Sequence, residues 1–211
     1  MDEKSRQFNK LFYNLSRIII WLFFKIFFLL KIKIVKFEEI PETGAAVIVA
    51  SHKSWLDILL LCLINPRNIH YIAKIELYKS KIAKLYFDAT GVIGIKRGEK
   101  DPEAIAKIVE TLKQGEIVAI YPEGTRFKGD GIGELNNGIA VMLLRNKVYP
   151  PIYPVVITYE KGSFLGLPLK INIIVGEKII PSNHQSVKVL MEEIRQTLTD
   201  LNKKSKIFIS S

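Results

Sequence analysis

Short apolar runs that alternate with helical patterns are the feature that most restricts how this chain can fold. After Pro41, runs rich in isoleucine and valine recur between segments whose apolar residues have helical spacing. We expect strands at residues 32–37, 46–50, 70–72, 92–95, 116–121, 152–158 and 169–175. We expect helices at residues 55–64, 75–87, 102–113, 138–145 and 184–202. Because continuous apolar strands alternating with helices are typical of α/β proteins, the sequence predicts a mostly buried mixed sheet of about seven strands flanked by helices.

The N-terminal segment departs from this pattern, because residues 18–30 are apolar except for Lys25. A helix of that length is about 20 Å long, shorter than the ~30 Å hydrocarbon core of a bilayer. At about 100° per residue, six polar or basic side chains fall within one arc of about 100°. These side chains are Arg6, Gln7, Lys10, Asn14, Arg17 and Lys25. A basic stripe on an otherwise apolar helix is typical of a helix that lies in the membrane interface.

Three other interpretations of this segment remain open. A cleaved signal peptide would need small residues after Leu30, where the sequence has Lys-Ile-Lys-Ile. A transmembrane helix over residues 8–30 would bury Arg17 or Lys25 in lipid. A helix packed on a soluble core is the third interpretation. We expect residues 1–36 to form an amphipathic, monotopic membrane-associated segment and residues 37–211 to form one catalytic domain.

The distribution of charge favours a membrane surface over nucleic acid. The formal net charge is +10, and residues 1–36 alone hold eight basic and two acidic residues. A nucleic-acid-binding domain usually carries its excess charge on the folded part. Here the aromatic residues cluster in the N-terminal helix and do not alternate with basic residues. We therefore expect no nucleic-acid partner.

The sequence lacks the residues of several other kinds of site. Its one cysteine, Cys62, excludes a disulfide framework and a cysteine-based zinc site, and the three histidines have no metal-ligand spacing. There is no Gly-x-Ser-x-Gly nucleophile motif and no phosphate loop ending in Gly-Lys-Ser/Thr. We expect neither a metal nor a bound cofactor.

Two side chains after the second expected strand have the spacing of an acid–base pair. His52 directly follows residues 46–50, at the carboxyl end of a strand, where open α/β sheets place their sites. Asp57 lies five residues on, at the start of an apolar helix, and can fold back to hydrogen-bond the imidazole. Such a carboxylate orients a general base and stabilises its protonated form. Alternatively, residues 54–57 are a helix capping box and His52 is a turn residue, and both interpretations can hold together.

Polar and basic residues follow three further expected strands. The turn after residues 116–121 offers backbone N–H groups, a hydroxyl and a guanidinium, which together suit a phosphate. The residues of this turn are Glu123, Gly124, Thr125 and Arg126. Arg97 follows residues 92–95, and Lys74 follows residues 70–72. Each residue alone has an ordinary explanation as a turn or surface residue, but four such strand ends together indicate a phosphate-binding site with acyl- or phosphoryl-transfer chemistry.

These residues resemble four motifs of the glycerolipid acyltransferases, and in particular of the bacterial 1-acylglycerol-3-phosphate acyltransferases. The family's His-x-x-x-x-Asp is similar to His52-Lys-Ser-Trp-Leu-Asp57, and its Gly-x-x-φ-Ile-x-Arg to Gly91-Val-Ile-Gly-Ile-Lys-Arg97. Its Phe-Pro-Glu-Gly-Thr-Arg-Ser is similar to residues 121–127, and its apolar run around a proline to residues 152–156. Lys74 matches a lysine between the first two motifs. The resemblance covers about residues 32–180, and four motifs in this order make it specific.

The resemblance implies a reaction and a general base. His52, oriented by Asp57, would take the proton from the free 2-hydroxyl of lysophosphatidate. The alkoxide would then attack the thioester of acyl-CoA or acyl carrier protein, giving phosphatidate and a free thiol. The resemblance requires neither a metal nor a covalent acyl-enzyme. The membrane-lipid acceptor implies a place at the cytoplasmic face of the cell inner membrane.

The resemblance also implies a binding site for the acceptor phosphate. Arg97 and Arg126, helped by Lys74, would hold the phosphate, and Glu123 would orient the basic groups or the backbone of the third motif. Gly124 and Thr125 belong to the same turn.

Three positions depart from the motifs, and the last of them, which lacks a basic group near the headgroup, leaves the exact lysolipid open. Gly94 replaces a bulky apolar residue, Phe127 replaces a serine, and residues 135–138 read Leu-Asn-Asn-Gly where members often have Phe-Lys-x-Gly. The first alternative is therefore another lysolipid, such as a lyso-aminolipid or lysophosphatidylethanolamine. The second is a non-catalytic basic protein of the membrane surface, which would not need His52 and Asp57.

Overall fold

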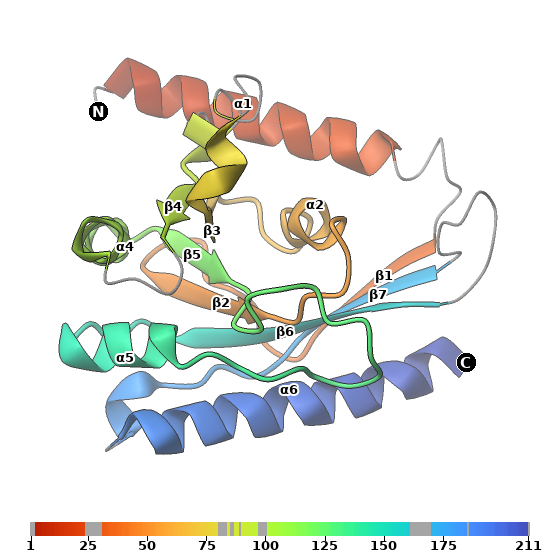
Figure 1. Ribbon diagram of the computed structural model, residues 1–211. Helices are drawn as coiled ribbons and strands as arrows, with labels where there is room; N and C mark the ends of the chain where they lie inside the picture. Colours follow the sequence, from red (N-terminus) through yellow and green to blue (C-terminus); the bar gives the residue numbers. More distant parts are fainter. Residues whose placement is uncertain are drawn as a thin grey trace.

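A seven-stranded sheet with helices on both faces forms the centre of the structure (Figure 1). The structure is a computed structural model, and it describes residues 3–23, 31–79, 84, 87, 88, 90–96, 101–160, 170–184 and 186–210. The strands are β1 (Lys31–Lys36), β2 (Ala46–Ala50), β3 (Ile69–Lys74), β4 (Ile93–Ile95), β5 (Ile117–Ile120), β6 (Ile152–Tyr159) and β7 (Lys170–Val175). Their order in the sheet is β1-β7-β6-β2-β5-β3-β4, and β6 and β7 are antiparallel while the other neighbours are parallel. The predicted α/β class and mixed seven-stranded sheet are confirmed.

The helices lie close to their predicted positions, although their ends differ. They are α1 (Glu3–Leu22), α2 (Asp57–Leu61), α4 (Pro102–Lys113), α5 (Gly138–Arg145), α6 (Val187–Ser210) and the 3-10 segments η2 (Ile75–Lys79) and η3 (Pro181–Asn183). The helix expected at residues 75–87 begins as η2, and most of its remainder lies outside the described residues. The helix α2 begins two residues later than expected, because the residues before it form a turn around the Asp57 carboxylate.

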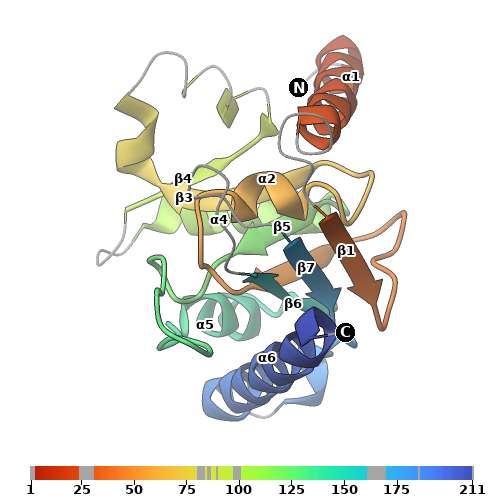
Figure 2. The ribbon, with the colours of Figure 1, turned by 90° about the vertical axis from the view of Figure 1, so that its right-hand side faces the viewer.

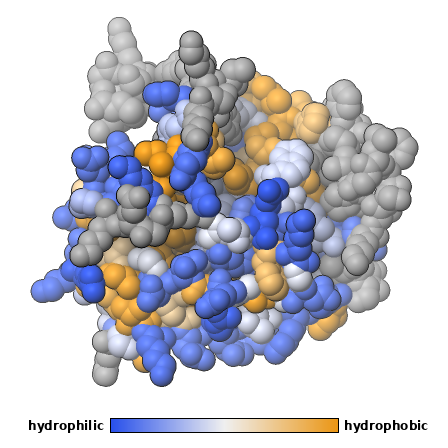
Figure 3. Space-filling model, in the orientation of Figure 1, coloured by the Kyte–Doolittle hydropathy of each residue, from blue (hydrophilic) through white to orange (hydrophobic). Residues whose placement is uncertain are grey.

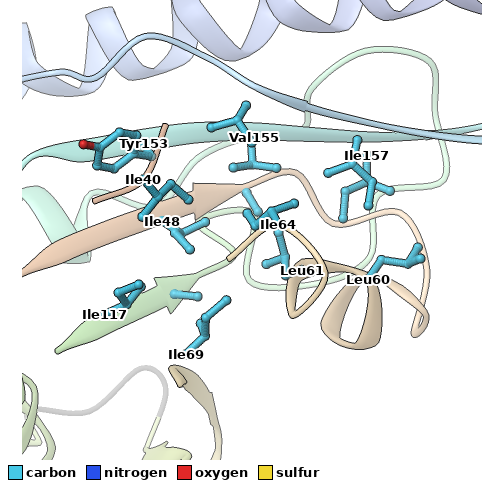
Figure 4. Packing of buried hydrophobic residues seen from close by; sticks show 14 of the residues in the cluster. Ile40, Ile48, Leu60, Leu61, Ile64, Ile69, Ile117, Tyr153, Val155 and Ile157 are labelled. Atoms are coloured by element: carbon cyan, nitrogen blue, oxygen red, sulfur yellow. The ribbon is translucent and has the colours of Figure 1, made fainter. Parts of the chain in front are cut away.

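The core has two layers because side chains of a strand point alternately to opposite faces of the sheet. Every residue of β2 is buried. Ile48 of this strand packs in one cluster with Leu60 and Leu61 of α2 (Figure 4), whereas Val47 packs with α4, α5 and α6 on the other face. The view in Figure 2 shows the same separation, with α2 above the sheet and α6 below it. This arrangement fixes α2 against the end of β2.

Four parallel neighbours in the sheet end at the same edge. In the order of the sheet these are β2, β5, β3 and β4. The carboxyl ends of parallel strands meet at one edge, which is where open α/β sheets bind ligands. The segments that follow these four strands therefore start side by side, although they are far apart in the sequence.

The helix α1 forms an outer layer over α2 (Figures 1 and 2). Tyr13 is buried, Ile20 packs against the cluster on the α2 side of the sheet, and Arg17 Nε donates a 2.7 Å hydrogen bond to the carbonyl oxygen of Cys62. Arg17, a member of the expected basic stripe, thus faces the domain, and Lys25 lies outside the described residues. The strand β1, which ends the segment 1–36, pairs with β7 within the sheet.

The opposite side of α1 is apolar and exposed. Its exposed large hydrophobic residues are Leu11, Leu15, Ile18, Ile19, Trp21 and Leu22, and Phe23 follows them. In Figure 3 hydrophobic surface gathers at the upper edge of the molecule, where Figure 1 places the second half of α1. Within the described part of the chain, no helix combines the length and the apolarity needed to cross a bilayer.

Candidate active site

His52 lies two residues after the end of β2, and the segment after β5 holds its backbone from both sides. The N–H of His52 donates to Glu123 Oε2 at 3.0 Å, and its carbonyl oxygen accepts from the N–H of Phe127 at 2.8 Å. One residue earlier, the N–H of Ser51 still donates to the Val155 carbonyl of β6 at 3.0 Å. The imidazole stacks on the ring of Tyr121 with centroids 4.3 Å apart. The ring is thereby held at the end of the sheet with 16% of its side chain exposed.

Asp57 forms the predicted pair with His52. Its carboxylate is fully buried, and Oδ2 accepts hydrogen bonds from His52 Nδ1 at 2.8 Å, Lys53 N at 2.7 Å and Ser54 N at 2.8 Å. The hydroxyl of Tyr159 donates to Oδ1. Because an ionised carboxylate only accepts hydrogen bonds, Nδ1 carries a proton and Nε2 of the neutral ring is left as an acceptor. This is the state that a general base requires.

The same loop also has part of the geometry of a capping box. The Asp57 carboxylate reaches back to the N–H of Ser54, and the Ser54 hydroxyl accepts from the N–H of Leu56 at 3.2 Å. The contacts that shape the start of α2 therefore also fix the carboxylate opposite the imidazole.

Glu123 connects two loops through its buried carboxylate. One oxygen, Oε2, accepts from His52 N, and the other, Oε1, accepts from Gly133 N at 3.0 Å. With 8% of the residue exposed, both oxygens are occupied by backbone N–H groups. Glu123 thus orients the backbone of His52 and Gly133, rather than the basic groups or the backbone of the third motif as expected, and this geometry leaves no direct role for it in holding a phosphate.

Three of the four strand ends line one groove with a volume of about 550 Å³. The residues expected at the site that line it are His52, Lys74, Gly124, Thr125 and Arg126. Ile58, Tyr71, Ile72 and Leu77 add apolar surface to the same groove. Asp57 and Glu123 lie behind these residues and do not line the groove, and Arg97 lies outside the described residues. The groove thus combines one imidazole, cationic side chains and apolar walls.

A tight turn places Thr125 and Arg126 at this groove. The N–H of Gly124 donates to the carbonyl of Tyr121 at 3.0 Å, which closes the turn directly after β5. Gly124 has a φ of 70°, a conformation that glycine adopts without strain. The side chains of Thr125 and Arg126 are exposed at the groove.

Sequence reasoning missed the role of Lys53. Its Nζ donates to the carbonyl of Gly129 at 2.9 Å and also to that of Gly131, and it lies 4.5 Å from the ring centroid of Phe127. Burial lowers the pKa of Lys53, while nearby carboxylates, Glu123 first, oppose that shift. Lys53 thereby fastens the loop after Arg126, and Phe127, the departure from the third motif, provides one face of that contact.

Two other residues at the site were not expected. Lys128 lines the groove and adds a cation two residues beyond Arg126. Tyr159 contacts Asp57 from the end of β6. Within a strand of continuous apolar character, no pattern in the sequence marks this tyrosine as a site residue. Among the described residues, no group of three or more His, Cys, Asp or Glu side chains is placed to hold a metal ion.

Comparisons with known proteins give one consistent family. The model of the family described as Acyltransferase matches residues 31–158. The 1-acyl-sn-glycerol-3-phosphate acyltransferase of Bacillus subtilis is 28% identical over 185 residues, which cover 82% of this chain and 89% of that protein. The lyso-ornithine lipid O-acyltransferase of Pseudomonas aeruginosa is 29% identical over 116 residues, 54% of this chain and 43% of that protein.

The fold has a close counterpart among solved structures. The crystal structure of the 1-acyl-sn-glycerophosphate acyltransferase from Thermotoga maritima superposes with a TM-score of 0.72 at 19% identity. The match covers 95% of this chain and 98% of that one. At this identity, the likeness is evidence for the shared fold.

We predict that Glu123→Ala destabilises the protein by about 1.5–3 kcal/mol, because hydrogen bonds to a charged group are lost and two buried N–H groups lose their acceptor. Urea unfolding measures this change. Glu134→Ala, which removes an exposed glutamate from the same loop, should stay within about 0.5 kcal/mol of the wild type. Equal stability of the two variants would show that Glu123 does not hold the loops together.

Proposed function

Because the chain belongs to the acyltransferase family, we propose that it transfers a fatty acyl group from an acyl thioester to the 2-hydroxyl of 1-acylglycerol-3-phosphate, making phosphatidate for phospholipid synthesis. The observation that carries this proposal is the 2.8 Å contact between His52 Nδ1 and the buried Asp57 at a groove that Lys74 and Arg126 also line. The general base and the phosphate-binding cations therefore lie at the same edge of the sheet.

The base acts through the ring nitrogen that Asp57 leaves free. His52 Nε2 accepts the proton of the 2-hydroxyl as its oxygen attacks the thioester carbonyl carbon. The resulting imidazolium is stabilised by the Asp57 carboxylate on its other side. Collapse of the tetrahedral intermediate breaks the carbon–sulfur bond, and the departing thiolate takes the proton from His52. General-base catalysis of this kind contributes about 10²–10⁴-fold to the rate.

The cationic residues at the strand ends position the acceptor. Arg126 and Lys74 hold the acceptor phosphate, with Thr125 beside Arg126 in the same turn. We assign Arg97 to the same task, as its place in the second motif implies. A phosphate fixed in the groove places the 2-hydroxyl against His52. The hydroxyl and the base are then held together in one complex and no longer have to meet by diffusion.

The acyl donor is the thioester of coenzyme A or of acyl carrier protein. No step that this chain's residues carry out requires a bound cofactor, because the base, its orienting carboxylate and the phosphate-binding cations are all side chains. The donor and the acceptor are therefore the partners that the reaction needs.

The substrate places the enzyme at a lipid surface. We propose that the segment 1–36 provides the attachment through α1, while its last strand, β1, completes the sheet of the catalytic domain that residues 37–211 form, on the cytoplasmic face of the inner membrane. The exposed apolar side of α1, which includes Leu15, Ile19 and Trp21, supports this attachment. An amphipathic helix that buries such a side in the interface binds without crossing the bilayer.

The second candidate is a related acyltransferase that acts on another lysolipid. The similarity to the lyso-ornithine lipid enzyme of Pseudomonas aeruginosa favours a lyso-aminolipid among the alternatives, which also include lysophosphatidylethanolamine. A headgroup without a phosphate monoester would make less use of Arg126 and Lys74. Product analysis by mass spectrometry, with a panel of lysolipids and both thioester donors, separates these acceptors. A protein without catalytic activity would give no product with any of them.

His52→Ala should reduce kcat by about 10²–10⁴-fold, the contribution of a general base, with little change in unfolding. Asp57→Asn should be nearly as severe because the ring loses its orienting carboxylate. Steady-state acylation of lysophosphatidate measures both effects, with His184→Ala as the matched control because His184 lies between η3 and α6. Near-normal turnover in folded His52→Ala protein would exclude this mechanism.

Arg126→Ala should lower kcat/KM for lysophosphatidate by about 10- to 100-fold, since one charge-assisted contact is worth about 1.5–3 kcal/mol. The effect on a lysolipid without a phosphate monoester should be much smaller. Arg145→Ala, an exposed arginine at the end of α5, is the control and should leave both substrates unchanged. An equal loss with both substrates would mean that Arg126 does not select the headgroup.

Replacing Leu15 and Ile19 together by glutamate should release the protein from vesicles of phosphatidylcholine and phosphatidylglycerol. Burial of each apolar side chain is worth about 1.5–3 kcal/mol, so binding should weaken by about tenfold or more. Flotation measures binding, and Val189→Glu on α6 provides an equally exposed control position. Unchanged flotation of the double variant would exclude α1 as the membrane contact.

A further inference from the structure

We propose that Tyr159, at the end of β6, is a positioning residue that holds the Asp57 carboxylate opposite His52 in the orientation that the base requires. This inference rests on the proposed function and adds to it a residue outside the four motifs. The dyad of His52 and Asp57 then depends on a hydroxyl from a strand that is remote in the sequence.

The sheet itself brings Tyr159 to the site. The strands β2 and β6 are parallel neighbours in which Ala50 pairs with Val155. The strand β2 ends at that pair, whereas β6 continues to Tyr159 and borders the loop that leads to Asp57. Ser51 extends the pairing, since its hydroxyl accepts from the N–H of Ile157 at 3.2 Å.

The two oxygens of Asp57 have different surroundings. His52 Nδ1 and the N–H groups of Lys53 and Ser54 all donate hydrogen bonds to Oδ2. Among the described residues, the hydroxyl of Tyr159 is the hydrogen-bond donor to Oδ1. Because Asp57 is fully buried, an oxygen without a donor would carry the full cost of desolvation. Tyr159 therefore supplies the hydrogen bond to Oδ1, the carboxylate oxygen that the residues of the motif itself do not contact.

Of the titratable groups around Asp57, Tyr159 is the one suited to donate a hydrogen bond to Oδ1. Burial and the neighbouring Asp57 carboxylate raise the pKa of Tyr159 far above its usual range, so its hydroxyl remains a donor. Burial also raises the pKa of Tyr121, whose ring stacks on His52 and whose hydroxyl has no hydrogen-bond partner among the described residues. The ammonium group of Lys53 is directed to the carbonyls of Gly129 and Gly131.

The direction in which removal of this hydroxyl shifts the pH dependence of the reaction can be predicted. Without a hydrogen bond to Oδ1, the ionised form of the buried carboxylate is less stable. Protonation of the carboxylate, or of the adjacent imidazole, then becomes more favourable. Both outcomes remove the neutral base that faces an ionised carboxylate. The acidic limb of the pH dependence of kcat/KM therefore moves to higher pH in either case.

Tyr159→Phe tests the proposal because it removes one oxygen atom and retains the ring. We expect kcat/KM for lysophosphatidate to fall about tenfold near neutral pH, with the acidic limb about one pH unit higher and partial recovery in alkali. Tyr153→Phe is the matched control, since Tyr153 is buried on the same strand and does not contact Asp57. Its pH profile should coincide with that of the wild type.

A second measurement does not depend on turnover. The chain contains three histidines, so the imidazole signal of His52 can be followed by NMR during a pH titration and assigned with His52→Ala. In Tyr159→Phe the midpoint of this titration should shift, while in Tyr153→Phe it should not. In wild-type protein, the Tyr159 hydroxyl proton should give a strongly downfield signal, which reports the contact even if the variant does not fold.

The outcomes separate this inference from the proposed function. A pH profile and a His52 titration that are unchanged in Tyr159→Phe would overturn the positioning role, even in a fully active enzyme. If wild-type protein acylates no lysolipid, the proposed function fails, but a shifted titration midpoint would still establish that Tyr159 acts on the dyad. Loss of rate without a shift in either pH measurement would reduce Tyr159 to a packing role and would also overturn the proposal.

Discussion

The burial of one negative charge organises this end of the molecule. A carboxylate removed from water costs several kcal/mol unless its oxygens are fully hydrogen-bonded. Asp57 meets this condition through the loop before α2, the imidazole of His52 and the last residue of β6. The length of β6, the late start of α2 and the turn after β2 are all parts of one arrangement around that charge.

Much of the fold was predictable because it follows from local patterns. Apolar runs located the strands, most clearly where a strand is wholly buried and its residues must be apolar, as in β2. The pair of His52 and Asp57 was predictable for a similar reason, because five residues separate them and one turn connects them. The turn at Gly124 was predictable from the residues that form it.

The remaining features depend on contacts that no local pattern encodes. Tyr159 reaches Asp57 because β6 neighbours β2, and the order of strands in a sheet cannot be derived from periodicity. The orientation of α1 is a second example. The helical spacing grouped Arg17 with other polar residues, but the packing of α1 on α2 decided that Arg17 faces the Cys62 carbonyl while the apolar side of the helix faces outward.

The pairing of β1 with β7 has a consequence for the order in which the chain folds. Lys31 pairs with Lys170, so a ribosome must deliver most of the chain before β1 finds its neighbour. Until then β1 is an unpaired edge that follows a helix with a large exposed apolar side, a combination that favours aggregation during synthesis. Early adsorption of α1 to a lipid surface would shield that apolar side while the rest of the sheet assembles. If α1 attaches the finished enzyme to the membrane, as we propose, the same helix would also protect its own nascent chain.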